Sequence, residues 1–258
     1  MPTLSAGQYQ LVYNMLSLAI AAMLGSFFFF TVSRSQLSAK YRPAMVMSSL
    51  VVAIAGYHYF RIFEAWKEAY VLRDTLYVAS GIPFNDTYRY VDWLLTVPLL
   101  VAELVAVLAL PKDVRGNLMT KLVVAAVAMI ALGYPGEIAD SMSSRALWGA
   151  LSTVPFAYIL YVLYGQLAKA SAKNSAEVRV LLRNTQLLLI GTWGFYPVAY
   201  MIPMMGLSGA TSKVALQVGY SVADIAAKCG YGLMIYHIAR AKMENEPAES
   251  HDAALAGH

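Results

Sequence analysis

Seven apolar stretches, each about as long as a helix that crosses a lipid bilayer, constrain this chain more than any other feature. A helix needs about 20 predominantly apolar residues to cross about 30 Å of hydrocarbon. Short segments rich in Gly, Pro, Ser and charged residues separate the stretches and are typical of loops. The sequence therefore predicts an all-α membrane protein, a seven-transmembrane-helix bundle with helices at residues 8–32, 43–66, 88–110, 118–133, 144–166, 181–205 and 213–240, of which the fourth is the shortest.

Composition and charge agree with this class. The 258 residues are 59% hydrophobic and 13% charged, whereas soluble domains contain about 25% charged residues. Cytoplasmic loops of membrane proteins collect Lys and Arg, which predicts an N-terminus outside and a C-terminus in the cytoplasm, across the inner (plasma) membrane. This topology explains the net charge of +4, and nothing indicates a nucleic-acid surface. The basic residues on the cytoplasmic side are Arg34, Lys40, Arg42, Lys112, Arg115, Lys121, Lys169, Lys173, Arg179, Arg183, Arg240 and Lys242, against Lys67, Arg73, Arg145 and Lys213 outside.

The chain is predicted to form one membrane domain with a short tail. The first apolar stretch follows no basic segment and no small-residue cleavage site, so we expect a retained helix instead of a signal peptide. Residues 1–241 are assigned to the seven-helix domain, and the polar residues 242–258 to a disordered cytoplasmic tail. The single cysteine, Cys229, lies in an apolar run and reports no redox compartment.

The third stretch carries ionisable residues at membrane depth, where such side chains are normally kept with a partner or a function. Asp92, Thr96 and Glu103 share one face, because eleven residues at about 100° each return to within about 20° of the same direction. Asp92 and Glu103 are about 16 Å apart along the axis, too far apart for one carboxylate pair. We expect Arg89 to keep Asp92 ionised, and Glu103, which lies among Val, Leu and Ala, to be protonated at rest. The two carboxyls are therefore suited to accepting and donating a proton, respectively.

The last stretch is unusual because it carries Asp224 and Lys228, one turn apart on one helix face. An ion pair within the helix is one interpretation. A buried lysine beside carboxylates is also the arrangement that holds a protonated Schiff base. A Schiff-base site accounts for the charges of the third and the last stretch together, whereas packing alone needs a separate reason for each.

The third stretch contains RYVDWLLTVPLL, the sixth contains WGFYPVAY and the last contains DIAAK. With these motifs nearly the whole chain resembles the microbial rhodopsins, in particular the proteorhodopsin and xanthorhodopsin group. The resemblance implies a light-driven outward proton pump, an ion transporter and not an enzyme, with all-trans retinal bound at Lys228 as a protonated Schiff base. By the same resemblance Asp92 is the primary counterion and proton acceptor, Asp224 the second counterion and Glu103 the proton donor. Thr96 completes the Asp-Thr-Glu triplet of outward pumps.

The resemblance also assigns the residues around the chromophore. Trp93, Trp193 and Tyr196 match positions that border retinal, and Tyr200 stands where many relatives have another tryptophan. Leu100 matches a colour-tuning position at which leucine accompanies green absorption. Without the resemblance these side chains would indicate ordinary packing in a membrane helix.

Two polar residues of the second stretch are expected near the counterions. His58 matches a histidine that hydrogen-bonds the primary acceptor in proteorhodopsins, so we expect it to contact Asp92. Tyr59 and Tyr196 match hydroxyl donors to the second counterion, Asp224. Hydrogen bonds of this kind stabilise the charged form of a carboxylate.

Other function classes are weighed against the same residues. By resemblance, a sodium pump would show Asn-Asp-Gln at the triplet, and a chloride pump would replace the acceptor carboxylate, so neither fits Asp92, Thr96 and Glu103. A photosensory rhodopsin that signals through a partner is the main alternative. Sensors generally lack a carboxylic donor at the position of Glu103, which favours pumping. A transporter without a chromophore requires that Lys228 stay free.

Gly149 lies in the motif WGALSTVPF of the fifth stretch and is the residue that indicates a binding site for a second pigment. A glycine in a membrane helix is often a point of close packing. The motif resembles xanthorhodopsin, in which glycine replaces a bulky tryptophan beside the retinal ring. The resemblance implies a lateral window through which a hydroxylated or keto-carotenoid antenna reaches the ring.

The sequence identifies neither a proton-release group nor a single oligomeric state. Residues 201–223 contain no Asp or Glu, so the pair of extracellular glutamates found in some pumps is missing. We expect release through Arg89 and water, after proton uptake. The partners expected by resemblance are the lipid bilayer and further copies of the chain, as a pentamer or hexamer.

Overall fold

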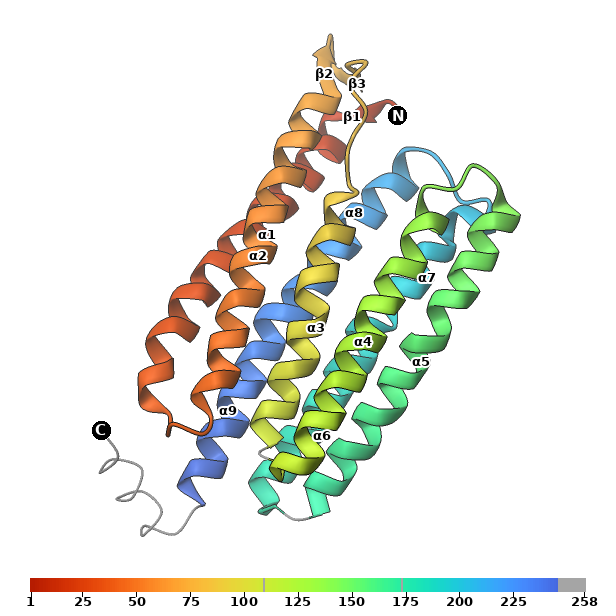
Figure 1. Ribbon diagram of the computed structural model, residues 1–258. Coiled ribbons are helices and arrows are strands. Elements are labelled where there is room, and N and C mark those ends of the chain that lie inside the picture. The colour runs from red at the N-terminus through yellow and green to blue at the C-terminus, as the bar shows by residue number, and fades with distance from the viewer. Residues whose placement is uncertain (109, 173, 246–258) are drawn as a thin grey trace.

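A computed structural model gives the structure of the chain and describes residues 1–108, 110–172 and 174–245. Almost all of these residues are helical, as the apolar stretches predict (Figure 1). The elements are β1 (Leu4–Ser5), α1 (Ala6–Ser33), η1 (Arg34–Gln36), α2 (Arg42–Ala69), β2 (Tyr70–Arg73), β3 (Leu76–Ala79), α3 (Tyr88–Leu108), α4 (Lys112–Glu137), α5 (Met142–Ala172), α6 (Ala176–Trp193), α7 (Phe195–Met201), η2 (Ile202–Met205), α8 (Ala210–Asp224), η3 (Ile225–Gly230) and α9 (Tyr231–Glu244).

The described residues form a bundle of seven helical spans. Consecutive helices from α1 to α6 pack side by side, while α9 packs on α6 and α8 on α1, which closes the bundle. The sixth span comprises α6, α7 and η2, and the seventh comprises α8, η3 and α9. Six spans of the described chain are long and apolar enough to cross a membrane, and the seventh, which carries Asp224 and Lys228, is not among them. The chain is thus a multi-pass integral membrane protein.

The apolar side chains fall into an inner core and a lipid-facing surface. Large buried residues such as Met23, Phe30 and Trp66 fill the interior. Many others point outward, and Tyr161 is 80% exposed. Exposure of apolar groups on this scale costs little in a bilayer, where the surrounding solvent is itself apolar.

Three short strands at the outer end were not expected from the sequence. Residues 70–79 form a hairpin, and β1 adds to it, so that the strand order is β1-β3-β2 (Figure 1). The tight turn places Asp74 at φ 54°, a conformation that Asp tolerates better than most residues. The Tyr9 ring stacks on Tyr77 with centroids 3.7 Å apart, which fixes the sheet to α1.

The predicted spans agree with the helices except in three respects. The fourth helix was expected to be the shortest, but α4 has 26 residues and α3 has 21, because polar residues continue α4 beyond its apolar window. The sixth span is interrupted at Gly194, where Pro197 lacks the N–H that would bond Trp193 O three to four residues earlier. The seventh span contains one stretch of π-helix, η3, which includes Lys228.

The proposed boundary of the tail lies inside a helix. α9 continues through Glu244, so residues 242–244 belong to the bundle and not to a tail. The Lys242 ammonium donates to Val107 O and Leu108 O at 3.1 and 3.0 Å and so binds the carbonyl end of α3. Residues 246–258 of the predicted tail lie outside the described part of the chain.

Candidate functional site

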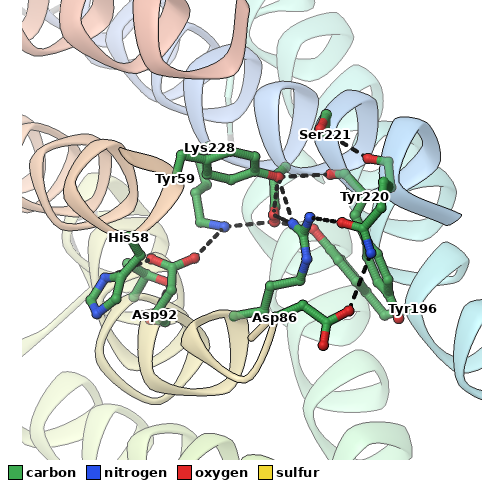
Figure 2. Close-up of polar contacts among 12 residues, drawn as sticks. His58, Tyr59, Asp86, Asp92, Tyr196, Tyr220, Ser221 and Lys228 are labelled. Atoms are coloured by element: carbon green, nitrogen blue, oxygen red, sulfur yellow. Dashed lines mark hydrogen bonds and ion pairs between the residues drawn. The ribbon is translucent and has the colours of Figure 1, made fainter. Parts of the chain in front are cut away.

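A buried ammonium between two carboxylates forms the centre of the site. Lys228 Nζ lies 2.6 Å from Asp224 Oδ1 and 3.0 Å from Asp92 Oδ2, and all three side chains are almost completely buried (Figure 2). Lys228 and Asp224 come from the seventh span, whereas Asp92 comes from α3. Buried charges of this kind require pairing, so each member of this group depends on the other two.

Asp224 is surrounded by hydrogen-bond donors. Tyr59 and Tyr196 donate to its two oxygens at 2.6 and 2.7 Å, the contacts that the resemblance implies (Figure 2). Arg89 Nη1 lies 3.6 Å from Asp224 Oδ2 and also donates to the Tyr59 hydroxyl at 3.0 Å. The guanidinium expected to hold Asp92 therefore pairs with Asp224 instead, because it extends from α3 toward the seventh span.

Asp92 has fewer donors than Asp224. His58 Nδ1 lies 4.0 Å from Asp92 Oδ1, within ion-pair distance, but its hydrogen bond goes to Ile54 O at 2.9 Å. Asp92 Oδ1 is buried and accepts no hydrogen bond from the described residues. Thr96 Oγ1 donates to the Asp92 carbonyl and not to its carboxylate. The charged form of Asp92 is thus stabilised by fewer hydrogen bonds than that of Asp224.

Glu103 lies deeper toward the inner end of α3 and is completely buried. Its Oε2 is 2.6 Å from Ser48 Oγ, which also lies 3.2 Å from Ala44 O. A hydroxyl has one proton to donate. Ser48 therefore donates either to Glu103 Oε2 or to Ala44 O, and in the second case a neutral Glu103 would donate its own proton to Ser48. Ser48 was not singled out from the sequence, because a serine inside an apolar helix carries no distinguishing pattern.

A cavity of about 330 Å³ begins at Lys228 and contains most of the predicted chromophore residues. Trp93, Leu100, Trp193, Tyr196, Tyr200 and Gly149 all line it, whereas Tyr59 stands outside its lining. The volume is within the range of small-molecule sites, which begin at about 300 Å³. The lining is aromatic and apolar apart from a few polar groups, which suits a long apolar molecule joined to Lys228.

The cavity also reaches the lipid-facing side of the bundle at Gly149. A Cβ at this glycine would lie 2.7 Å from Tyr200 Cε1, so the absence of a side chain lets the tyrosine ring lie against α5. The Tyr200 hydroxyl donates to Arg145 O at 2.7 Å, which fixes the ring. The exposed side chains of Met201 and Met204 belong to the same lining as buried Lys228.

Comparison with known proteins agrees with this site. Residues 10–242 match the family model of bacteriorhodopsin-like proteins. The green-light absorbing proteorhodopsin of Gamma-proteobacterium EBAC31A08 is 33% identical over 232 residues, covering 88% of this chain and 86% of the relative. Archaerhodopsin-2 of Halobacterium sp. (strain aus-2) is 27% identical over 238 residues, covering 91% of this chain and 88% of the relative.

Two solved structures are more similar. Xanthorhodopsin, described as a light-driven ion pump with dual chromophore, is 52% identical with a TM-score of 0.90, covering 96% of this chain and 100% of that one. A thermophilic rhodopsin is also 52% identical, with a TM-score of 0.91 and coverage of 95% and 100%. The family match extends from residue 10 to residue 242, and the chain belongs to the bacteriorhodopsin-like family of microbial rhodopsins.

Proposed function

We propose that this protein is a light-driven outward proton pump that carries all-trans retinal as a protonated Schiff base on Lys228. The observation that supports this most is the buried Lys228 Nζ, held between Asp92 and Asp224 at one end of an apolar cavity. The family supports a retinal chromophore, and the similarity to proteorhodopsin and to the ion pump xanthorhodopsin supports transport.

The cavity residues suit such a chromophore. Retinal would supply the absorption of visible light and the change in geometry that alters the environment of the Lys228 nitrogen. Trp93, Trp193 and Tyr196 would hold its polyene on aromatic surfaces, and Leu100 would contact it from α3. Burial of apolar surface supplies the affinity, while Lys228 supplies the covalent attachment.

The choice of Asp92 as proton acceptor follows from the hydrogen bonds of the two carboxylates. Asp224 accepts hydrogen bonds from Tyr59 and Tyr196 and forms an ion pair with Arg89, and all three interactions favour its charged form. Asp92 shares the Lys228 proton at 3.0 Å without such support. A proton that leaves Lys228 Nζ therefore binds Asp92 at lower cost, and Asp224 stays ionised.

Glu103 is positioned to replace that proton from the other side. It lies about 16 Å from Asp92 along α3, on the inner side of Lys228. A neutral acid in an apolar site on the cytoplasmic side is suited to donate a proton to the Lys228 nitrogen after the first transfer. Asp92 accepts the proton on the outer side of Lys228, and Glu103 donates a proton from the cytoplasmic side. The two transfers together move one proton outward. The photosensory alternative gives no role to this buried acid.

Glu103→Gln should retain the absorption band, because residue 103 does not line the cavity. Reprotonation of the Lys228 nitrogen should slow by about 100-fold, the lower end of what a positioned general acid contributes. Flash photolysis measures this step, and external azide should restore part of the rate. Ser48→Ala serves as a control that keeps the acid. An unchanged cycle in Glu103→Gln would show that Glu103 is not the donor.

The transport itself is tested by illuminating cells that make the protein with retinal in unbuffered medium. The medium should become more acidic, and a protonophore should abolish the signal. A chromophore without acidification would favour the sensor.

A carotenoid antenna is the second part of the proposal. The cavity lining that includes Gly149, Met201 and Met204 supports an opening from lipid toward the chromophore. Outside it, α5 presents exposed apolar side chains, among them Leu147 and Val154, along which a polyene would bury apolar surface. A hydroxylated or keto-carotenoid lying there would pass excitation to retinal.

Gly149→Trp should abolish the transfer of excitation, because the new side chain occupies the place of the window and forces Tyr200 aside. The measurement is the excitation spectrum of retinal fluorescence after incubation with hydroxylated or keto-carotenoids. Gly165→Trp is the matched control, because a Cβ at Gly165 on the same helix meets nothing within 4 Å. Carotenoid bands of equal strength in wild type and Gly149→Trp would eliminate the window as the route.

A further inference from the structure

A row of hydrogen bonds leads from the buried site to the outer surface. Arg89, which pairs with Asp224, donates from Nη2 to Gln217 Oε1 at 2.6 Å. Gln217 Nε2 donates to Asp86 Oδ2 at 3.2 Å, and Lys213 Nζ donates to the same oxygen at 3.2 Å. Figure 2 shows Asp86 on the side of this group away from His58 and Asp92. The row thus joins the second counterion to a carboxylate in the loop before α3.

The charges at its two ends fix the orientation of Gln217. Its carbonyl oxygen faces the guanidinium of Arg89, and its amide hydrogens face the carboxylate of Asp86. The reverse orientation would place two donors together at Arg89 and two acceptors together at Asp86. Gln217 is almost fully buried, so water does not replace either partner at low cost. The amide therefore couples the position of Arg89 to the charge of Asp86.

Asp86 stands where buried and exposed groups meet. Its side chain is 36% exposed and that of Lys213 is 25% exposed, whereas Arg89 and Gln217 are buried. Two further carboxylates at this end of the bundle form ion pairs, but their partners lie elsewhere: Glu64 pairs with Lys67 at 3.0 Å, and Glu137 pairs with Arg145 at 2.7 Å, beside Tyr200. Within the described residues, Asp86 is the outer carboxylate that hydrogen bonds connect to Arg89.

We propose that Asp86 is the release residue of the pump, with Gln217 as the residue that positions Arg89 toward it. The inference rests on the proposed outward transport. When Asp92 gives up its proton, its O–H bond breaks and water carries the proton past Arg89. An O–H bond forms on the Asp86 carboxylate, which then breaks to give the proton to extracellular water and restores the anion. Because the Asp86 carboxylate accepts hydrogen bonds from Lys213 and Gln217 and binds the proton only after Asp92 has given it up, release comes late in the cycle.

The test compares wild type with Asp86→Asn by time-resolved infrared spectroscopy and a pH-sensitive dye in the external medium. Wild type should show a transient carboxylic-acid band that the variant lacks, after deprotonation of Asp92. Proton release in Asp86→Asn should slow by about 100-fold, while the visible band and the protonation of Asp92 stay unchanged. Asp86→Glu should restore release and shift the infrared band.

Asp140→Asn is the matched control, because Asp140 is an exposed aspartate at the same end of the bundle. Release in Asp86→Asn at the wild-type rate, or the persistence of the late carboxylic-acid band in that variant, would overturn the role of Asp86 and leave the pump intact. Wild type that releases no proton would overturn the pump, and the role of Asp86 with it. A delay in Asp140→Asn equal to that in Asp86→Asn would also overturn the assignment.

Discussion

Lys228→Ala is expected to give a protein without a visible absorption band, whatever the supply of retinal. The side chain that provides the amine is lost, and the described residues that line the cavity include no other lysine. Removal of the cation also leaves Asp92 and Asp224 buried without their common partner. Breaking a buried ion pair costs about 3–5 kcal/mol, so the free energy of unfolding should fall as well.

Lys228→Arg separates loss of the amine from loss of the fold. The guanidinium keeps a positive charge near Asp92 and Asp224 but forms no Schiff base with an aldehyde. Both variants should be colourless, whereas thermal unfolding should be closer to wild type in Lys228→Arg. The measurements are visible absorption after addition of retinal and a thermal melt of the purified protein. A retinal-dependent band in Lys228→Arg would place the attachment point elsewhere.

Asp92→Asn is expected to shift the absorption band to longer wavelength and to stop transport. The Asp92 carboxylate lies 3.0 Å from Lys228 Nζ, so replacing it by a neutral amide removes stabilisation of the ground-state cation. The amide also accepts no proton from the nitrogen. The absorption spectrum and light-induced pH changes measure the two effects.

Asp224→Asn provides the comparison for the acceptor. In the wild type, hydrogen bonds from Tyr59 and Tyr196 keep Asp224 ionised, so the first carboxylic-acid infrared band of the cycle should come from Asp92. This band should therefore disappear in Asp92→Asn and persist in Asp224→Asn. The opposite pattern would make Asp224 the acceptor. That result would fit the shorter of the two Lys228 contacts, 2.6 Å to Asp224.

The spans and the main charged residues could be predicted from the sequence because their signals are local. Apolar length gives the helices, and helical periodicity places Asp92 and Glu103 on one face. The pair of Asp224 and Lys228 follows from a spacing of four residues. In each case the signal lies within a single element.

Features that depend on contacts between elements could not be predicted in this way. The sequence places Arg89 one turn from Asp92, yet its partner is Asp224, because Tyr59 and Gln217 from other helices determine the direction of the guanidinium. The hydrogen bond of Ser48 to Glu103 joins α2 to α3. No residue pattern in the sequence marks the π-helical turn at Lys228. Whether a turn of an α-helix becomes π-helical depends on how the neighbouring helices pack against it.

The surroundings of Gly149 also depend on contacts between helices and could not be predicted from the sequence. The resemblance indicates room at Gly149, but it does not tell which neighbouring side chain occupies that room. In the structure the Tyr200 ring takes part of the space, held by its hydrogen bond to Arg145 O. A carotenoid at this site would therefore contact Tyr200 as well as the open face of α5.

The measurement that decides most is the direction of proton movement on illumination. Cells that contain the wild-type protein with bound retinal, suspended in unbuffered medium, should acidify that medium in the light. The change should reverse in the dark and vanish with a protonophore, and cells that contain Lys228→Arg should give no change. A visible chromophore without acidification, or a rise of the external pH that the protonophore abolishes, would contradict outward pumping.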